Sequence, residues 1–400
     1  MKLVIISYIL PFIISLATIY YAAQNKSVNN FFFDEPLQEN LSVPDFRVIG
    51  NFLNNNNIYE EHFLKSGNKS EIIYLLGSSE LTAVTGAIPY NFITERFTTK
   101  LKGVGHAGNQ CLSIYTQLLA NKERLENAPI IIILSPGWFE SKAAKGTSSE
   151  IFLEFNSERF LHKILADKKP SEFHTYLYKR IAEMYTEFTS PGIELKLMNF
   201  YHLASKSFIH AGVYTPLILC DNVLMKSKEK ISPQMKTTNA SFKRIPVSSD
   251  TIIINWDSIY TASRKEVLSK VTNNHMGISD SYYTEYICGK IGQTEPVNEY
   301  FNQELEDFKM LTKLLNKTKV NASFIISPLN PFYYKNLKDI LPTINTITAE
   351  LKKNKFPYLN LLEPDTDKYD KAILHDVMHM SDYGWYKADK FIIDTYHLSK

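Results

Sequence analysis

Four continuous apolar runs form the strongest pattern along the chain. They are Ile72–Leu76 (IIYLL), Ala128–Ser135, Ala322–Ser327 (ASFIIS) and a run that begins at Phe356 (FPYLNLL). A short apolar run without polar alternation is typical of a strand buried on both faces, as in a parallel sheet. Helical patterns separate these runs, and the alternation predicts an α/β fold in which helices flank a parallel sheet.

The helical patterns set the expected domain organisation. They are clearest in Cys111–Ala120, Glu158–Phe188, the region around Asn336–Lys353, and the aromatic end Trp385–Tyr396. Residues 71–400 are predicted to form one domain, interrupted by a large, mostly helical insertion at about residues 140–303. Residues 25–70 are rich in Asn with apolar patches, and we interpret them as a stalk that leads into the sheet.

The N-terminal residues predict a membrane anchor. Leu3–Ala23 contains no charged residue, and about 20 apolar residues are enough to cross a bilayer as a helix. The rival interpretation is a cleaved signal peptide, but the sequence Tyr-Tyr-Ala-Ala before Gln24 places Tyr at the minus-three position of the cleavage site. We therefore expect residues 1–24 to be one uncleaved transmembrane helix in the cell membrane, with the rest outside the cytoplasm.

Composition is that of an ordinary globular protein attached to this anchor. The chain has 400 residues, of which 44% are hydrophobic and 22% charged, and a formal net charge of +2. The charge gives no indication of a nucleic-acid binder. The three cysteines, Cys111, Cys220 and Cys288, are too scattered for a disulfide framework or a zinc site.

Two short motifs supply the candidate catalytic residues. In Gly77-Ser78-Ser79-Glu80, Ser79 lies just past the first predicted strand, where open α/β sheets bind ligands. A serine hydroxyl needs an adjacent base and a group that orients the base. Asp376 and His379, three residues apart near the C-terminus, have the residue types for both roles. Each motif alone is also common in turns that have no catalytic role.

A glycine-rich stretch is the third candidate element. Lys102–Gln110 (KGVGHAGNQ) precedes Cys111–Ala120, which we expect to be an amphipathic helix. Glycine lets a backbone N–H approach a substrate closely, so the amides of Gly108 and Ser79 could together form an oxyanion hole. Most glycine-rich turns have no such role.

The order of these motifs resembles the SGNH (GDSL-type) hydrolase superfamily and, more narrowly, the DltD family, which consists of membrane-anchored proteins of teichoic acid D-alanylation. The resemblance runs through nearly all of the part that follows the anchor. The matching stretches are Leu75–Leu81, Gly105–Ser113, Ile131–Phe139, Ile254–Ile259, Asn273–Ile287 and His375–Trp385.

The resemblance implies an SGNH-like catalytic domain in which Ser79 is the nucleophile, Asp376 and His379 are its partners, and Gly108 donates to the oxyanion. One departure stands out, because Gly137 occupies a position where the superfamily usually has Asn and the DltD family is expected to have Gln. Asn109 or a backbone amide would have to replace that third oxyanion donor.

The implied activity is serine-dependent acyl transfer to teichoic acid or a related envelope polymer, without a metal or organic cofactor. The acyl group, D-alanyl or similar, would come from a D-alanyl carrier protein through a membrane-bound O-acyltransferase. One alternative is an esterase that transfers the acyl group to water. The other is a non-catalytic scaffold that binds a carrier protein or a polymer.

Two segments of the predicted insertion carry weaker signals. Lys226–Arg244 has six basic residues and one acid, so it is either a site for an anionic polymer or membrane surface, or an ordinary solvated loop. Tyr282–Tyr286 is rich in aromatic residues. Such a segment either stacks on a sugar or polyol chain or belongs to the core.

Overall fold

The computed structural model describes residues 72–206, 254–290 and 301–398, apart from residues 84, 106, 157, 166, 168 and 169. The predicted anchor (residues 1–24), the predicted stalk (25–70) and the basic segment Lys226–Arg244 lie outside the described residues. Among the residues that are described, no helix is both long and apolar enough to cross a membrane.

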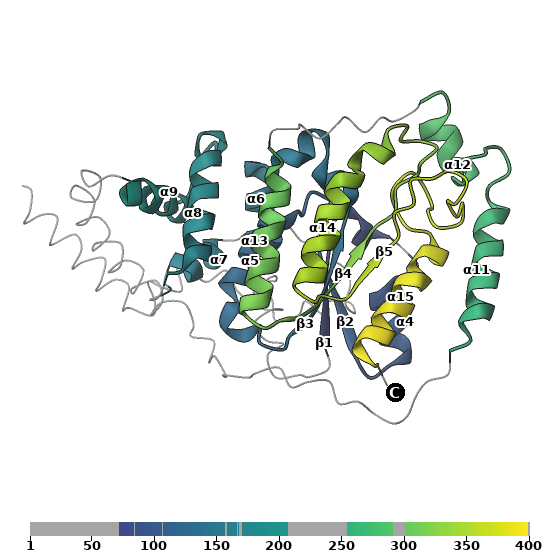
Figure 1. The fold of residues 1–400 in the computed structure, drawn as a ribbon, viewed down its shortest axis with the longest axis horizontal. Helices are drawn as coiled ribbons and strands as arrows, with labels where there is room; N and C mark the ends of the chain where they lie inside the picture. Colours follow the sequence, from purple (N-terminus) through teal and green to yellow (C-terminus); the bar gives the residue numbers. More distant parts are fainter. Residues whose placement is uncertain are drawn as a thin grey trace, which may run out of the picture. The chain divides into compact units, whose positions relative to one another are not determined.

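A five-stranded parallel sheet is the centre of the fold (Figure 1). Its order is β2-β1-β3-β4-β5, and every neighbouring pair is parallel. The strands are β1 (Ile72–Leu76), β2 (Lys100–Val104), β3 (Pro129–Leu134), β4 (Asn321–Ile326) and β5 (Tyr358–Asn360). The chain passes from β1 outward to β2 and then returns to β3 on the other side of β1. The carboxyl ends of β1 and β3 therefore flank a switch point, where α/β sheets bind ligands.

Helices cover both faces of this sheet (Figure 1). On one face α13 packs against both α5 and α14, and on the other α15 packs against α4 and α11. Their bounds are α4 (Pro89–Arg96), α5 (Cys111–Ala120), α11 (Trp256–Ser269), α13 (Gln303–Lys317), α14 (Leu341–Lys353) and α15 (Asp382–Tyr396).

The remaining helical elements lie between these along the sequence. The α-helices are α6 (Ser149–Phe155), α7 (Glu158–Leu165), α8 (Glu172–Met184), α9 (Ile193–Lys206) and α12 (Asp280–Tyr282). The 3-10 helices are η3 (Ser79–Thr82), η4 (Lys122–Arg124), η5 (Pro136–Phe139), η6 (Ser141–Lys145), η7 (Tyr185–Glu187) and η9 (Leu337–Ile340), while η8 (Tyr283–Ile287) is a π-helix.

The described chain divides into two compact units. One contains residues 161–206, where α8 and α9 pack together and the rings of Tyr178 and Tyr201 stack with centroids 5.7 Å apart. The other unit contains the sheet, its covering helices and both candidate catalytic motifs. The candidate site therefore lies within one unit.

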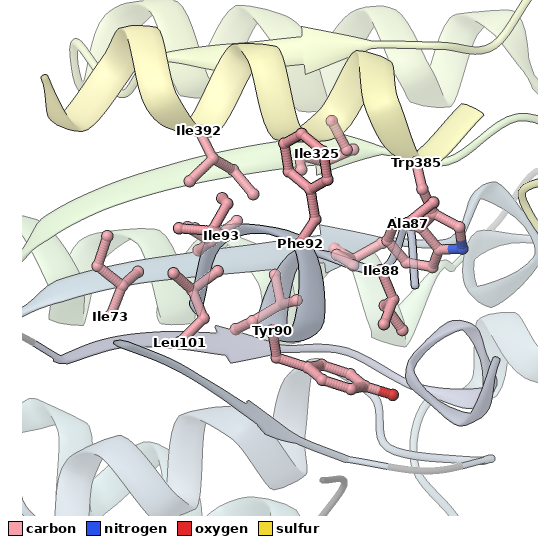
Figure 2. Packing of buried hydrophobic residues seen from close by; sticks show 14 of the residues in the cluster. Ile73, Ala87, Ile88, Tyr90, Phe92, Ile93, Leu101, Ile325, Trp385 and Ile392 are labelled. Atoms are coloured by element: carbon pink, nitrogen blue, oxygen red, sulfur yellow. The ribbon is translucent and has the colours of Figure 1, made fainter. Parts of the chain in front are cut away.

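Burial on both faces explains why the strands read as unbroken apolar runs. Figure 2 shows one core, in which Ile73 of β1 and Ile325 of β4 lie among side chains of α4 and α15, including Trp385. On β4 the ring of Phe324 meets Phe308 of α13, with centroids 6.1 Å apart. Apolar side chains of β4 thus contribute to two helical layers.

The structure confirms the predicted parallel α/β fold and corrects three details. Lys100–Val104 is an edge strand, β2, although Lys102 was expected to begin a glycine-rich turn; its two lysines and Gly103 lack the signature of a buried strand. Helix α5 is buried over its whole length rather than amphipathic. Strand β5 covers only the middle of the run that begins at Phe356.

Candidate active site

The turn after β1 presents Ser79 at the carboxyl edge of the sheet. The Gly77 N–H donates to the Val104 carbonyl at 3.2 Å, which joins this turn to the end of β2. Ser79 then begins the short helix η3. The side chain of Ser79 is partly exposed, whereas Ser78 is buried. Of the two adjacent serines, Ser79 is the more accessible to a substrate.

Three side chains from the two ends of the described chain meet at this edge. His379 Nε2 lies 3.0 Å from Ser79 Oγ, and His379 Nδ1 lies 2.7 Å from Asp376 Oδ2. The second carboxylate oxygen, Asp376 Oδ1, accepts the backbone N–H groups of Met378 at 2.8 Å and His379 at 2.7 Å. The structure therefore brings together Ser79, His379 and Asp376 in the order that nucleophilic catalysis by serine requires.

The loop that carries Asp376 and His379 is fixed by backbone contacts. Its two ends pair at an isolated bridge between Leu374 and Met380, and the His375 N–H donates to the His379 carbonyl at 2.8 Å. The Asn330 N–H, after β4, donates to the Val377 carbonyl at 3.0 Å. These bonds fix the backbone of the loop, and the contact between His379 Nδ1 and Asp376 Oδ2 then orients the imidazole.

Electrostatics favours an ionised Asp376 beside His379. Burial raises the pKa of Asp376, but the hydrogen bond and charge of His379 and the two loop amides outweigh it, so its pKa falls below the usual value. The hydrogen bond from Asp376 raises the pKa of His379 above 6.5, against the opposing effect of burial. Asp376 is thus suited to stabilise an imidazolium.

Glu80 is a second carboxyl group at the site, and its sequence context gave no indication of a role. It is only 4% exposed, and its Oε2 accepts the Ser78 N–H at 3.1 Å. Burial raises the pKa of Glu80, while backbone amides and the charge of His379 oppose that rise. Glu80 therefore holds the turn that presents Ser79 and also acts electrostatically on His379.

The expected oxyanion donors are arranged differently from the prediction. The Gly108 N–H donates to Ser78 Oγ at 3.1 Å, so Ser78 bridges the two loops and makes no side-chain bond as a helix cap. Asn109 is fully buried, and its amide donates to the Gly77 carbonyl at 2.9 Å. The side chain of Asn109 thus supports the turn in this structure. Which group replaces the donor expected at position 137 stays a prediction.

Gly137 lies on η5, directly after β3. A Cβ atom at this position would lie 3.6 Å from Ser135 Oγ and 3.8 Å from Glu140 Oε1, which are ordinary contact distances. Glu140 is 9% exposed, and its Oε2 has no hydrogen-bond partner among the described residues. Burial raises the pKa of Glu140 to about 7.

A cleft of about 450 Å³ opens beside the three catalytic candidates. Besides Ser79, Asp376 and His379, its polar lining includes Thr82, Lys270 and Ser279. The cleft thus extends from the nucleophile to helix α11 and to the segment before α12. In the ranges that the structure describes, no group of three or more His, Cys, Asp or Glu side chains is placed to hold a metal ion.

A parallel sheet that carries serine, histidine and aspartate at its carboxyl edge is the arrangement of the SGNH class of hydrolases. The profile of the family described as DltD protein matches residues 49–397. Because the match covers most of the chain, this protein belongs to the DltD family. Membership implies involvement in teichoic acid D-alanylation. No curated protein matches the chain.

Proposed function

We propose that this protein is a membrane-anchored serine acyltransferase that transfers D-alanyl, or a similar acyl group, to teichoic acid or a related envelope polymer. The observation that carries the proposal is the line of contacts from Ser79 Oγ to His379 and on to Asp376, at 3.0 and 2.7 Å. Membership of the DltD family supports the choice of acyl group and acceptor.

In the first half of the reaction, Ser79 Oγ attacks the carbonyl carbon of the acyl donor. His379 Nε2 takes the serine proton, and Asp376 stabilises the resulting imidazolium. The leaving group then departs with that proton, which leaves an acyl ester on Ser79. The Ser79 amide and the Gly108 amide are the oxyanion donors that we assign, with the Gly108 N–H turning from Ser78 Oγ to the developing charge.

In the second half, a hydroxyl of the polymer replaces the leaving group. His379 removes its proton as the hydroxyl oxygen attacks the ester, and the same proton returns to Ser79 Oγ when the ester bond to the enzyme breaks. The proposal needs no metal or organic cofactor for either half. It includes a D-alanyl carrier protein and a membrane-bound O-acyltransferase as the partners that deliver the acyl group.

The proposed location is the cell membrane, with the catalytic part outside the cytoplasm. It follows from the uncharged run Leu3–Ala23. Protease added to intact spheroplasts should digest the catalytic part, whereas protection of the whole chain would contradict this location.

Mass spectrometry of the intact protein tests the proposed intermediate. After incubation with an activated D-alanyl thioester, we expect an adduct with the mass of one acyl group on the peptide that contains Ser79. The mass identifies the acyl group, and the modified peptide identifies the nucleophile. An unmodified Ser79, together with no labelling by a fluorophosphonate probe, would contradict acyl-enzyme chemistry and favour a binding scaffold.

An esterase that uses water is the second candidate. It is favoured by the exposure of the His379 side chain, which at 32% leaves the imidazole accessible to solvent. The catalytic residues would be the same, so only the acceptor separates the two functions. Faster loss of the acyl adduct on addition of polymer hydroxyls supports the transferase, whereas loss to water at an unchanged rate supports the esterase.

The charge of Asp376 predicts how activity depends on pH. His379 must be neutral to accept a proton, so activity should fall as pH decreases through the pKa of His379, which Asp376 raises above 6.5. Asp376→Asn removes that effect, and the midpoint of the acidic limb should move to lower pH while the plateau decreases. The measurement is kcat/KM for a small ester from pH 5 to about 9.

Glu80→Gln provides a related test, because Glu80 contributes less than Asp376 to the raised pKa of His379. Its acidic limb should shift in the same direction by a smaller amount. If the acidic limb of the pH profile does not move in Asp376→Asn, the fall in activity at low pH reflects the titration of a group other than His379.

A further inference from the structure

Tyr282 and Tyr286 form an aromatic pair at the molecular surface. Their ring centroids are 4.9 Å apart, and Tyr286 is 49% exposed. The pair spans α12 and the π-helix η8, and single π-turns are frequent at functional sites. Tyr282 is partly buried and packs against the small core of Met276, Ile278, Ile287 and Val377, whereas Tyr286 is not part of that cluster. The aromatic segment is therefore not simply part of the core.

This pair lies beside the catalytic loop. The ring of Tyr282 is 6.5 Å from that of His375, between centroids, and the charge of Asp376 contributes to the raised pKa of Tyr282 after the larger effect of burial. The Ser279 N–H, just before α12, donates to the His375 carbonyl at 3.2 Å. A ligand that contacts both tyrosines would lie next to the residues that hold the imidazole.

A second pair of tyrosines, Tyr333 and Tyr334, packs against the same small core as Tyr282. The rings of Tyr333 and Tyr334 meet edge to face with centroids 4.8 Å apart, and both are partly exposed. Their segment is also tied to this core through Asn330, whose side chain donates to the Met276 carbonyl at 3.0 Å. We call Tyr282, Tyr286, Tyr333 and Tyr334 the tyrosine row.

An unused hydroxyl lies in the cleft, on the residue directly before α12. Ser279 lines the cleft together with Ser79 and His379, and it is 8% exposed. Its Oγ has no hydrogen-bond partner among the described residues. Leaving a buried hydroxyl without a partner costs about 1–3 kcal/mol of free energy. A ligand in the cleft that carries hydroxyl groups would supply the missing hydrogen bond.

We propose that the tyrosine row and Ser279 form the acceptor subsite, and that they bind a polyhydroxylated chain of the sugar or alditol class. Such a chain presents C–H groups, which pack on aromatic faces, and hydroxyls, which bond to phenol and serine oxygens. A purely apolar ligand would leave the Ser279 hydroxyl unpaired. The inference rests on the proposed acyl transfer.

The subsite has a defined role in the second half of that reaction. It holds the polymer so that one hydroxyl reaches the acyl ester at Ser79. The bond from that hydroxyl oxygen to the acyl carbon forms, the bond to Ser79 Oγ breaks, and the hydroxyl proton passes through His379 to Ser79. The subsite itself transfers no proton.

The test uses the full-length protein in detergent, an activated D-alanyl thioester as donor and purified teichoic acid as acceptor. Tyr286→Ala should raise the KM for teichoic acid about tenfold, the effect of losing one aromatic contact and its buried area. Tyr286→Phe keeps the ring and should stay within about twofold of the wild type. Ser279→Ala should raise the same KM. Fluorophosphonate labelling of Ser79 should be unchanged in both Tyr286 variants.

A tyrosine outside the row serves as the control. Tyr185, on η7 in the other compact unit, is partly exposed, and Tyr185→Ala should leave the KM unchanged. An unchanged KM in Tyr286→Ala and in the Tyr282→Ala, Tyr286→Ala double variant would overturn the subsite. The subsite would also be overturned if these variants lost fluorophosphonate labelling of Ser79 and acyl transfer to the same extent, because the tyrosines would then only support the catalytic loop.

Binding measured without catalysis separates this inference from the proposed function. Calorimetry with Ser79→Ala should show teichoic acid binding that Tyr286→Ala weakens by the same factor. If the wild type forms no acyl adduct but this binding pattern holds, the acyl transfer fails and the subsite stands. If the adduct forms and the binding is insensitive to the tyrosines, the subsite alone fails.

Discussion

Ser79→Ala and His379→Ala should each lower the rate of acyl transfer by about 10⁴-fold or more while leaving the fold intact. Ser79 supplies the attacking oxygen and His379 removes its proton, so either change disables the same step. The double variant should be little worse than either single variant, because residues that act as a unit are not additive. The measurements are single-turnover transfer of D-alanyl and thermal unfolding of each variant.

Ser78→Ala is the matched control. It removes a neighbouring hydroxyl that is 4% exposed and accepts the Gly108 N–H at 3.1 Å. The loss of that bond should cost about 1 kcal/mol of stability, and substantial activity should remain. The nucleophile is wrongly assigned if Ser78→Ala is inactive and Ser79→Ala still forms an acyl adduct.

The apolar runs predicted the centre of the fold because burial on both faces leaves a clear signature. Ile72–Leu76 coincides with β1, and the predicted strands at Ala128–Ser135 and Ala322–Ser327 agree with β3 and β4 within one residue at each end. Strand β2 carries no such signature. It is an edge strand with charged positions and Gly103, so its composition resembles a turn.

The sequence predicted which residue types form the candidate site, but only some of the contacts between them. Ser79, Asp376 and His379 stood out because each follows an apolar run at a position where a parallel sheet places functional groups. The hydrogen bond between Ser79 and His379 joins residues 300 positions apart. The bond between Asn109 and Gly77 is also non-local, since the two residues are 32 positions apart. Glu80 is close to Ser78 in sequence, but no local pattern indicates that its carboxylate would accept the Ser78 N–H.

Gly105→Ala should be among the most damaging single substitutions in the described chain. Gly105 has a φ of +141°, and a Cβ atom there would lie 1.9 Å from the Gly77 carbonyl oxygen. The overlap is with backbone atoms of Gly77, which cannot rotate away, so the turn that presents Ser79 must move. Backbone strain together with such a displacement should destabilise the protein by more than about 3 kcal/mol. Chemical denaturation measures the stability, and fluorophosphonate labelling reports on Ser79.

Gly86→Ala is the control, because a Cβ atom at Gly86 would meet nothing within 4 Å. It should change the stability by less than about 1 kcal/mol and leave the labelling of Ser79 unchanged. If Gly105→Ala accumulates only as unfolded protein, the large destabilisation is already observed. If it folds with wild-type stability and labels at the wild-type rate, the end of β2 does not position the turn after β1, and another contact must hold Ser79 toward His379.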